Sequence, residues 1–385
     1  MTHSTGKALR QKPLKPDPEF PLFPHACGLW AKKIKGQLKY FGKWDDPETA
    51  LQRYKDFVAG KSTDGTTIKE LANSFLRFKE AAMENGELSP RSFRDYFHTC
   101  SHLVDFFGRS QLIDELKPDD FGRYRAHLSK RMGLVSLTNE INRSRIIFRH
   151  GVDSELLERA PRFGKSFERP RKESLQRVKL AKGDRLFSAQ DIRRILEAAD
   201  PTMQAMVLLA INAGYGQTDI ASLPKSAIDF KGGWLTFPRP KTLVLRRCPL
   251  WKETAKALKA VIALRPEAKV PADDGLAFLT HHGRPFVRTK RNAKDEIISI
   301  DTILPAFQKL IDTLDGVPRL GFYRLRHSHR TVSDGAMDKG ASDAIMGHTD
   351  PSMAGNYTHG RDDERLVKVC KHICDWLFPA KKKAK

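Results

Sequence analysis

The feature that most limits the fold of this chain is a basic, aperiodic stretch near its middle. Residues 161–183 are rich in Arg and Lys, are broken by Pro and Gly, and lack apolar residues at the spacing of a helix or a strand. Such a segment has no apolar face to bury, so we expect an extended linker. The chain of 385 residues is long enough for two or three domains, and the linker predicts that it is multidomain.

The region before the linker, residues 63–160, carries apolar residues at helical spacing from Thr67 to about Phe148. Four amphipathic helices fit it, and they read IKELANSFLRFKEAAMENG, SPRSFRDYFHTCSHLVDFFG, KPDDFGRYRAHLSKR and SLTNEINRSRIIFRHG. Proline marks helix starts at Pro90 and Pro118, and glycine marks helix ends at Gly108 and Gly151. We therefore expect an all-helical domain.

The N-terminal region predicts a flexible tail followed by a small folded module. Residues 1–20 combine Pro, Gly and Lys with few apolar residues, which is typical of a flexible basic tail. In residues 21–62, two runs of β-formers around Lys35-Gly36 predict a hairpin, and Asp46 caps an amphipathic helix. The sheet of this ββα module would carry four lysines: Lys32, Lys33, Lys35 and Lys39. They fit contact with DNA and a solvated face equally well.

After the linker, residues 184–378 mix helices with short strands. Ser188 caps a helix, and the apolar stretch PTMQAMVLLAINAG follows it as a second one. Two β-like runs, WLTFPRPKT and LRRCPLW, predict a hairpin, and GLAFLT predicts a short strand. Helices dominate from there, and residues 379–385 are expected to form a basic tail. The expected fold class is mainly α with small β elements.

The charge balance indicates a polyanionic partner. Lys and Arg number 68 against 46 Asp and Glu, which gives a net charge of +22 and a pI of about 9.8. Double-stranded DNA is the expected partner, with an anionic membrane surface or simple solubility as the alternatives. No apolar run approaches the roughly 20 residues of a membrane span, and the N-terminus lacks the apolar segment of a signal peptide. We therefore expect a cytoplasmic protein without a membrane partner.

The five cysteines form no recognisable metal motif. Cys370 and Cys374 lie at the i, i+4 spacing of one helix face, but His372 points to another face. A second pair of ligands at a zinc spacing is missing from the sequence around them. We expect thiols in the core or on the surface, and neither a metal nor a cofactor.

Three short boxes near the C-terminus carry residues suited to phosphodiester chemistry. They are Tyr323-Arg324-Leu325-Arg326-His327-Ser328, Ile345-Met346-Gly347-His348-Thr349 and Asn356-Tyr357-Thr358-His359. Arg326 and His348 are 22 residues apart, and His348 and Tyr357 are 9 residues apart. In this order and at this spacing, the boxes resemble the catalytic boxes of the tyrosine recombinase, or phage integrase, family.

The resemblance extends from about Thr67 to Phe378 and implies both an architecture and a function. It implies that the helical region is a SAM-like core-binding domain and that residues 184–378 form a mixed α+β catalytic domain. The N-terminal module resembles the arm-binding domain that some integrases carry. The implied function is site-specific recombination of DNA through a 3′-phosphotyrosyl intermediate on Tyr357. The implied setting is a bacterial or phage-encoded protein associated with the nucleoid.

Elementary chemistry explains why these residue types are needed. Cutting a phosphodiester without a metal requires a nucleophile, cations for the charge that builds on the phosphoryl oxygens, and an acid for the leaving oxygen. The resemblance makes Tyr357 the nucleophile, Arg326 a phosphate ligand, and His348 a hydrogen-bond partner of the phosphate or the nucleophile. It makes Lys241, in the hairpin, the general acid, and Tyr323 a donor where the family most often has His. A salt bridge for Arg326, a helix cap for His348 and an exposed hairpin lysine for Lys241 remain as alternatives.

One position departs from the family pattern. Gly216 stands where the family has its first arginine, in the segment GYGQTD. Losing one positioned donor from a charge-stabilising site costs about 3–4 kcal/mol, or a hundredfold to thousandfold in rate. Backbone N–H groups of this turn, at Gly216 and Gln217, together with Arg239, Arg246 or Arg247, are the hypothesised replacements. A simple loss of catalysis is the alternative.

Two other functions are compatible with the same boxes. One is a non-catalytic DNA-binding protein, and the other is a topoisomerase-like enzyme that nicks and reseals DNA without exchanging partners. The C-terminal residues 361–378 predict an amphipathic helix that docks on its own domain or on a neighbouring protomer. The resemblance favours the neighbour, and with it a homotetramer on DNA. The apolar face consists of Leu366, Val369, Cys370, Ile373 and Leu377.

Overall fold

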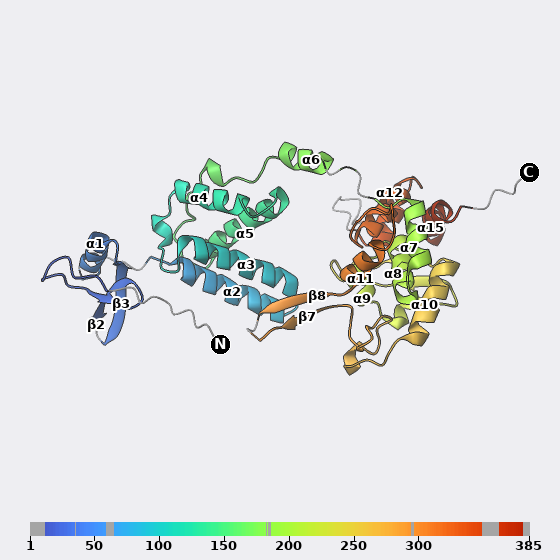
Figure 1. The fold of residues 1–385 in the computed structure, drawn as a ribbon, viewed down its shortest axis with the longest axis horizontal. Coiled ribbons are helices and arrows are strands. Elements are labelled where there is room, and N and C mark those ends of the chain that lie inside the picture. The colour runs from blue at the N-terminus through green and yellow to red at the C-terminus, as the bar shows by residue number, and fades with distance from the viewer. Residues whose placement is uncertain are drawn as a thin grey trace, which may run out of the picture. The chain divides into compact units, whose positions relative to one another are not determined.

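The chain forms two compact units in the computed structural model (Figure 1). Its described residues are 12–34, 36–58, 65–181, 183, 186–293, 296–348 and 362–379. The N-terminal unit contains Met1–Asn85 with Tyr96–Pro170, and the C-terminal unit contains Gly86–Asp95 with Arg171–Lys385. Helices dominate both units and the sheets are small and antiparallel, so the predicted fold class is confirmed.

The N-terminal module has one strand more than the sequence predicted. Its elements are β1 (Phe23–His25), β2 (Leu29–Ile34), β3 (Gln37–Lys43) and α1 (Pro47–Val58). The predicted β2–β3 hairpin is present, and Asp46 caps α1 by accepting from the Thr49 backbone N–H at 3.1 Å. The tail predicted over residues 1–20 is wrong at its end, because Phe20 is only 3% exposed and packs on Trp30 with ring centroids 4.8 Å apart. The extra strand β1 has three residues and contains a proline, so it carries no periodic signal.

Two of the lysines expected on this sheet are held by aromatic rings of α1. Lys32 Nζ donates to the Tyr54 hydroxyl at 2.7 Å and lies 4.4 Å from the centre of that ring. Lys39 Nζ lies 4.4 Å from the ring centre of Phe57. Lys33 is exposed, whereas Lys35 falls outside the described residues.

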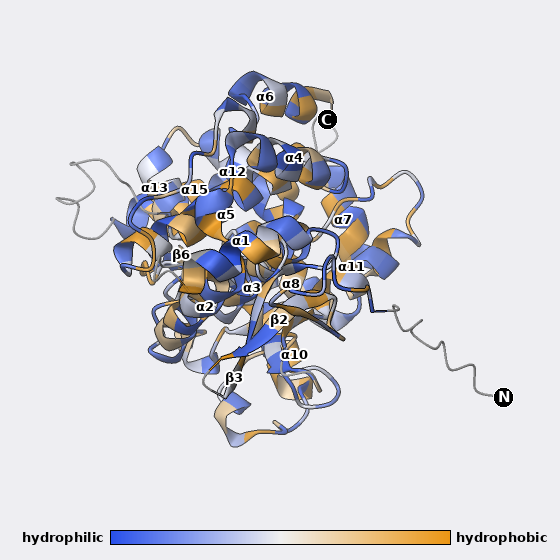
Figure 2. Cartoon of the chain, turned by 90° about the vertical axis from the view of Figure 1, so that its left-hand side faces the viewer, coloured by the Kyte–Doolittle hydropathy of each residue, from blue (hydrophilic) through white to orange (hydrophobic). Residues whose placement is uncertain are grey.

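The helical part of the N-terminal unit contains the four predicted helices. They are α2 (Ile68–Glu84), α3 (Pro90–Phe107), α4 (Pro118–Ser129) and α5 (Leu134–Asp153), and α3 belongs to this unit from Tyr96 onward. A short 3₁₀ turn, η1 (Ile113–Glu115), lies between α3 and α4. Figure 2 shows both hydrophilic and hydrophobic residues along α2, as expected for a helix with one buried face. The predicted end of the last helix at Gly151 is wrong, because α5 continues to Asp153.

The linker predicted over residues 161–183 is not extended. It begins with a 3₁₀ turn, η2 (Lys165–Phe167), whose Phe167 is fully buried and stacks on Phe163 with ring centroids 5.7 Å apart. A helix follows, α6 (Lys172–Ala181), and it buries none of its residues. Sparse aromatic anchors and an exposed basic helix lack apolar periodicity, which is why the pattern suggested a linker without regular structure. The last of the boundaries between the two units, after Pro170, falls within this segment.

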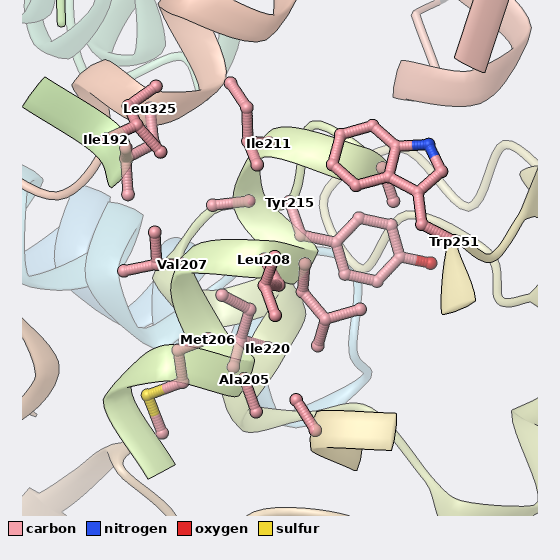
Figure 3. Close-up of a cluster of buried hydrophobic side chains, with 14 of the residues drawn as sticks. Ile192, Ala205, Met206, Val207, Leu208, Ile211, Tyr215, Ile220, Trp251 and Leu325 are labelled. Atoms are coloured by element: carbon pink, nitrogen blue, oxygen red, sulfur yellow. The ribbon is translucent and has the colours of Figure 1, made fainter. Parts of the chain in front are cut away.

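The C-terminal unit is built around a helix that is buried on nearly all sides, α8 (Pro201–Asn212). Figure 3 shows part of this core, in which Tyr215 lies among apolar side chains that include Leu208 and Ile220. The surrounding helices are α7 (Ala189–Ala198), α9 (Gln217–Ala221), α10 (Lys252–Leu264), α11 (Ile303–Ile311), α12 (Arg324–Asp334), α13 (Lys339–Met346) and α15 (Asp363–Leu377). Ser188 caps α7, as predicted, by accepting from the Asp191 backbone N–H.

Two small sheets complete the C-terminal unit. The first has the order β4 (Ile228–Asp229), β5 (Trp234–Thr236), β6 (Arg247–Pro249), and the second pairs β7 (Val287–Arg291) with β8 (Ile297–Asp301). The predicted hairpin corresponds to β5 and β6, with Leu235 opposite Cys248. The strand predicted at GLAFLT is wrong, since that segment makes only an isolated bridge at Leu276. The β7–β8 hairpin was missed because its strands alternate weakly between apolar and polar residues.

The apolar face of α15 is buried within its own unit. All five of its predicted apolar residues belong to the core, and the Trp251 indole N–H donates to the Cys370 carbonyl at 3.1 Å. The prediction that this face docks on a neighbouring protomer is therefore wrong. The same amphipathic pattern fits either partner, and only the fold distinguishes them. Among the described residues, helices with the length and apolarity needed to cross a membrane are absent.

Candidate active site

Arg326 is a buried cation that joins three segments of the C-terminal unit. It lies in the first turn of α12 and is 3% exposed. Its Nη1 donates to the Gly214 carbonyl, and its Nη2 donates to the Met346 carbonyl at 3.0 Å. Nη2 also lies 3.0 Å from His348 Nε2. Burial, followed by repulsion from Arg239, lowers the pKa of Arg326.

His348 faces Arg326 through a defined ring nitrogen. It follows α13 directly, after Gly347 in the left-handed conformation with φ of 64°. A guanidinium can only donate, so Nε2 must present its lone pair to Arg326. The other nitrogen, Nδ1, then carries the proton and donates to Asp343 Oδ1 at 3.2 Å. Burial lowers the pKa of His348, Asp343 opposes that shift and Arg326 adds to it, so the neutral imidazole is favoured.

Asp343 orients His348 and was not identified from the sequence. Its carboxylate also accepts from Arg330 at 2.7 Å and from Lys339 at 2.8 Å. Burial acts to raise the pKa of Asp343, but the hydrogen bonds from Lys339 and His348 and the charge of Arg330 lower it overall. Asp343 lies within α13, five residues before His348, which follows the end of that helix, and this spacing was the available signal.

The turn after α8 contains Gly216, the position at which an arginine was expected. The backbone N–H of Gly216 donates to Asp219 Oδ2 at 2.7 Å, so this N–H, which was expected to bind phosphate, already has a partner. The side-chain amide of Gln217 donates from Nε2 to Asp301 at 3.3 Å, so the side chain of Gln217 is engaged as well. A Cβ atom on Gly216 would lie only 3.0 Å from Tyr323 Cε2. The ring of Tyr323, which is 44% exposed, therefore fills the space beside Gly216.

The β5–β6 hairpin approaches the same site. Arg239 Nη1 and Thr242 Oγ1 each donate to the Gly347 carbonyl at 3.4 Å. Lys241 lies between these two anchors and is exposed at the hairpin turn. The candidate acid Lys241 is therefore within two residues of both side chains that bond to Gly347, the residue before His348.

Arg246 and Arg247 are neighbours in sequence but lie on opposite sides of the hairpin. Arg246 is 1% exposed, lies 4.0 Å from the ring centre of Tyr215 and pairs with Asp219 at 3.2 Å. Arg247 is exposed, lies 4.1 Å from the ring centre of Trp234 and pairs with Asp363 at 2.8 Å. Successive side chains on a strand point to opposite faces. Arg247 is therefore not part of the site, contrary to its place among the hypothesised replacements.

Tyr357, the expected nucleophile, lies outside the described residues, which resume at Asp362. Both flanks of that segment are fixed. His348 is held by Arg326 and Asp343, and Asp362 caps α15 by accepting from the Glu364 backbone N–H at 2.9 Å. Among the described residues, clusters of three or more potential metal ligands are absent.

Comparisons with known proteins find one family model and several related folds. Residues 185–364 match the model of the phage integrase family. No curated protein sequence is significantly similar to the chain. The fold resembles that of a lambda integrase tetramer bound to a Holliday junction, with 12% identity and a TM-score of 0.55 over 88% of this chain and 98% of that chain. It also resembles the Tn1549 transposon integrase in complex with transposon right end DNA, with 16% identity and a TM-score of 0.55 over 80% of this chain and 100% of that chain.

Proposed function

The chain belongs to the phage integrase family through residues 185–364, and from this premise we propose that it is a site-specific DNA recombinase that cuts and rejoins double-stranded DNA through Tyr357. The observation that carries the proposal is the environment of Arg326. This guanidinium is buried, and among the described residues its partners are two carbonyls and a neutral imidazole, without an ion-paired carboxylate. A buried charge without a counter-ion is costly, so the site favours an anion. A DNA phosphate supplies that anion.

The proposed reaction is a transfer of the phosphoryl group from DNA to tyrosine and back. The Tyr357 oxygen attacks phosphorus, the bond from phosphorus to the 5′ oxygen breaks, and a 3′-phosphotyrosyl ester forms. Arg326 donates to the non-bridging oxygens, and Lys241 gives a proton to the leaving 5′ oxygen. The reverse steps, with a 5′ hydroxyl of another strand as nucleophile, rejoin the DNA without an external energy source.

His348 is suited to the remaining proton transfer. Its Nδ1–H is held by Asp343, so its Nε2 lone pair is directed at Arg326. When the phosphate takes over the Arg326 donors, Nε2 becomes free to accept the phenolic proton of Tyr357. Tyr323, exposed at the start of α12, offers a phenol as an additional donor to the phosphate.

DNA binding and assembly follow from charge and from the related structures. The net charge of +22 favours a polyanion. The related lambda integrase is a tetramer on a Holliday junction, and we propose a homotetramer on DNA for this chain as well. We propose that its partner is nucleoid DNA, as expected for a bacterial or phage-encoded protein.

A suicide DNA substrate tests the proposal. A nick near the cleavage point lets the short fragment diffuse away, so that the covalent protein–DNA adduct accumulates. The wild type is expected to form the adduct, and Tyr357→Phe, which lacks only the nucleophilic oxygen, is expected to form none. Tight binding of a cleavable site without adduct in the wild type would refute recombination and favour a DNA-binding protein. Adduct with resealing but without exchange between two DNA molecules would favour a topoisomerase-like enzyme.

A further inference from the structure

Arg246 is a second buried cation of the C-terminal unit. Its side chain is 1% exposed, and it belongs to the core face of the β5–β6 hairpin. Its aliphatic part lies directly beneath Gly347, since a Cβ atom there would be 2.7 Å from Arg246 Cδ and 2.8 Å from Cγ. Burying a guanidinium costs several kcal/mol unless its charge and its donors are compensated. Its position needs an explanation beyond packing.

The compensation around Arg246 is incomplete. Its Nε donates to the Phe237 carbonyl at 3.1 Å, and its Nη2 donates to the Pro238 carbonyl at 3.4 Å. Its Nη1 is 3.2 Å from Asp219 Oδ1, but the pair is not aligned for a hydrogen bond, and Nη1 has no hydrogen-bond partner within the described part of the chain. The face of Tyr215 lies 4.0 Å from the guanidinium and adds a cation–π contact. One buried donor thus remains unused.

Asp219 contacts both this unused donor and the backbone of Gly216, the position that lacks a side chain. One of its oxygens accepts from the Gly216 backbone N–H at 2.7 Å, and the other faces Arg246. Without Arg246, the site would contain a partly buried carboxylate beside the expected phosphate, and like charges repel. Asp219 therefore needs a cation, and position 216 does not supply one. The cation comes from another element, nearly thirty residues later in the chain.

We propose that Arg246 supplies, from the β5–β6 hairpin, the second positive charge of the phosphate site, in place of a side chain at position 216. The inference rests on the proposed function. Arg246 is a positioning residue: it neutralises Asp219, so that this carboxylate does not oppose the field of Arg326 at the phosphate. The strongest alternative from the same hairpin is Arg239, which donates only to the Gly347 carbonyl at 3.4 Å and makes no ion pair with Asp219 among the described residues.

The test uses the full chain on the suicide substrate, with single-turnover adduct formation and DNA affinity measured side by side. Arg246→Met keeps the length and removes the charge, and it is expected to slow adduct formation about 10²- to 10³-fold while changing affinity only a few-fold. Arg247→Met is the matched control, since it removes the same charge from the exposed face of the same hairpin, and it is expected to match the wild type. Arg246→Lys, which keeps the charge, is expected to lie between Arg246→Met and the wild type.

Rescue separates a role in charge supply from a role in packing. Adding Gly216→Arg and Tyr323→His to Arg246→Met places a cation at position 216 and replaces the phenol ring beside it with the smaller imidazole. We expect this to recover at least tenfold in rate. Equal losses in Arg246→Lys and Arg246→Met without rescue would show a packing role and overturn the inference. If Arg246→Met does not fold, Arg246→Gln, which keeps donors for the two carbonyls, replaces it.

The two proposals fail in different ways. Adduct that depends on Tyr357 and forms at the wild-type rate in Arg246→Met or Arg246→Gln overturns the inference and leaves the recombinase in place. Absence of any Tyr357-dependent adduct in the wild type overturns both.

Discussion

The space beside the Cα of Gly216 is filled by the ring of Tyr323, so two departures from the family pattern form one exchange at the residue scale. The sequence presented them as independent, since the two positions are more than a hundred residues apart. A side chain at position 216 would have to displace the ring of Tyr323. This explains why a glycine at 216 and a tyrosine at 323 occur together here. It also makes Gly216→Arg alone a poor test of the missing charge.

The protonation state of His348 gives a prediction for the pH dependence of cleavage. Its folded-state pKa is lowered from the ordinary value of 6.5, and the neutral ring is the form that can accept a proton at Nε2. The neutral form therefore dominates above pH 6.5 and is lost as the pH falls through the lowered pKa. The single-turnover rate of adduct formation is expected to be flat between about pH 7 and 8 and to fall on the acid side, with its inflection below pH 6.5.

The substitution Asp343→Asn tests whether His348 sets this pH dependence. It removes the carboxylate that raises the pKa of His348, so the inflection is expected to move further toward acid. It also removes the charged acceptor that keeps the proton on His348 Nδ1, so the rate of adduct formation on the plateau should drop by up to about 100-fold. Lys339→Met, which alters another partner of the same carboxylate, should stay within about twofold of the wild type on the plateau. An inflection above pH 6.5 in the wild type would contradict the assignment of a neutral His348.

At the scale of elements, local signals predicted helices well and strands less well. Caps such as Ser188 and Asp46 act within one turn, so the sequence alone located the starts of their helices. The β1 strand and the β7–β8 hairpin depend on cross-strand partners that no local pattern reveals. The same limit applied to the hairpin arginines. Arg246 and Arg247 are adjacent residues of the same type, so the sequence does not distinguish them, and only the strand register decides which of them faces the site.

The passage of α5 through Gly151 gives a stability prediction in which two effects compete. Alanine is a better helix former than glycine by about 1 kcal/mol, which favours Gly151→Ala. The new Cβ would lie 2.7 Å from Leu157 Cδ1 and 2.8 Å from Leu71 Cδ1, and overpacking of this kind costs about 1–3 kcal/mol. We expect Gly151→Ala to be destabilised in urea unfolding monitored by circular dichroism.

A double-mutant cycle identifies the cause of that loss. Leu157→Ala removes one of the two clashing side chains, so Gly151→Ala should cost less in the Leu157→Ala background than in the wild type. A stabilised Gly151→Ala, or equal effects in both backgrounds, would show that α5 does not pack against Leu157 as described.

At the scale of the whole molecule, charge and fold each limit the function without determining it. The positive excess predicted a nucleic-acid partner, and the family match agrees with that prediction. The predicted docking of α15 on another protomer was wrong, because an amphipathic helix has the same sequence pattern whether its apolar face packs on its own unit or on another protomer. Assembly is therefore a property that the sequence pattern of a single helix cannot supply.

The number of phosphates that the molecule contacts can be read from the salt dependence of DNA binding. Each neutralised phosphate contributes about 0.9 to the slope of log affinity against log salt, so 6–10 contacts lower affinity about 10³- to 10⁵-fold between 50 and 200 mM salt. A fall of less than tenfold would contradict an electrostatic interface.

Exposed Lys33 on the sheet of the N-terminal module tests whether that sheet touches DNA. If it does, Lys33→Glu is expected to lower the slope of log affinity against log salt by about 1. Lys55→Glu makes the same charge change on α1 and should leave the slope unaltered, so equal slopes for both variants and the wild type would mean that the sheet carries solvated lysines only.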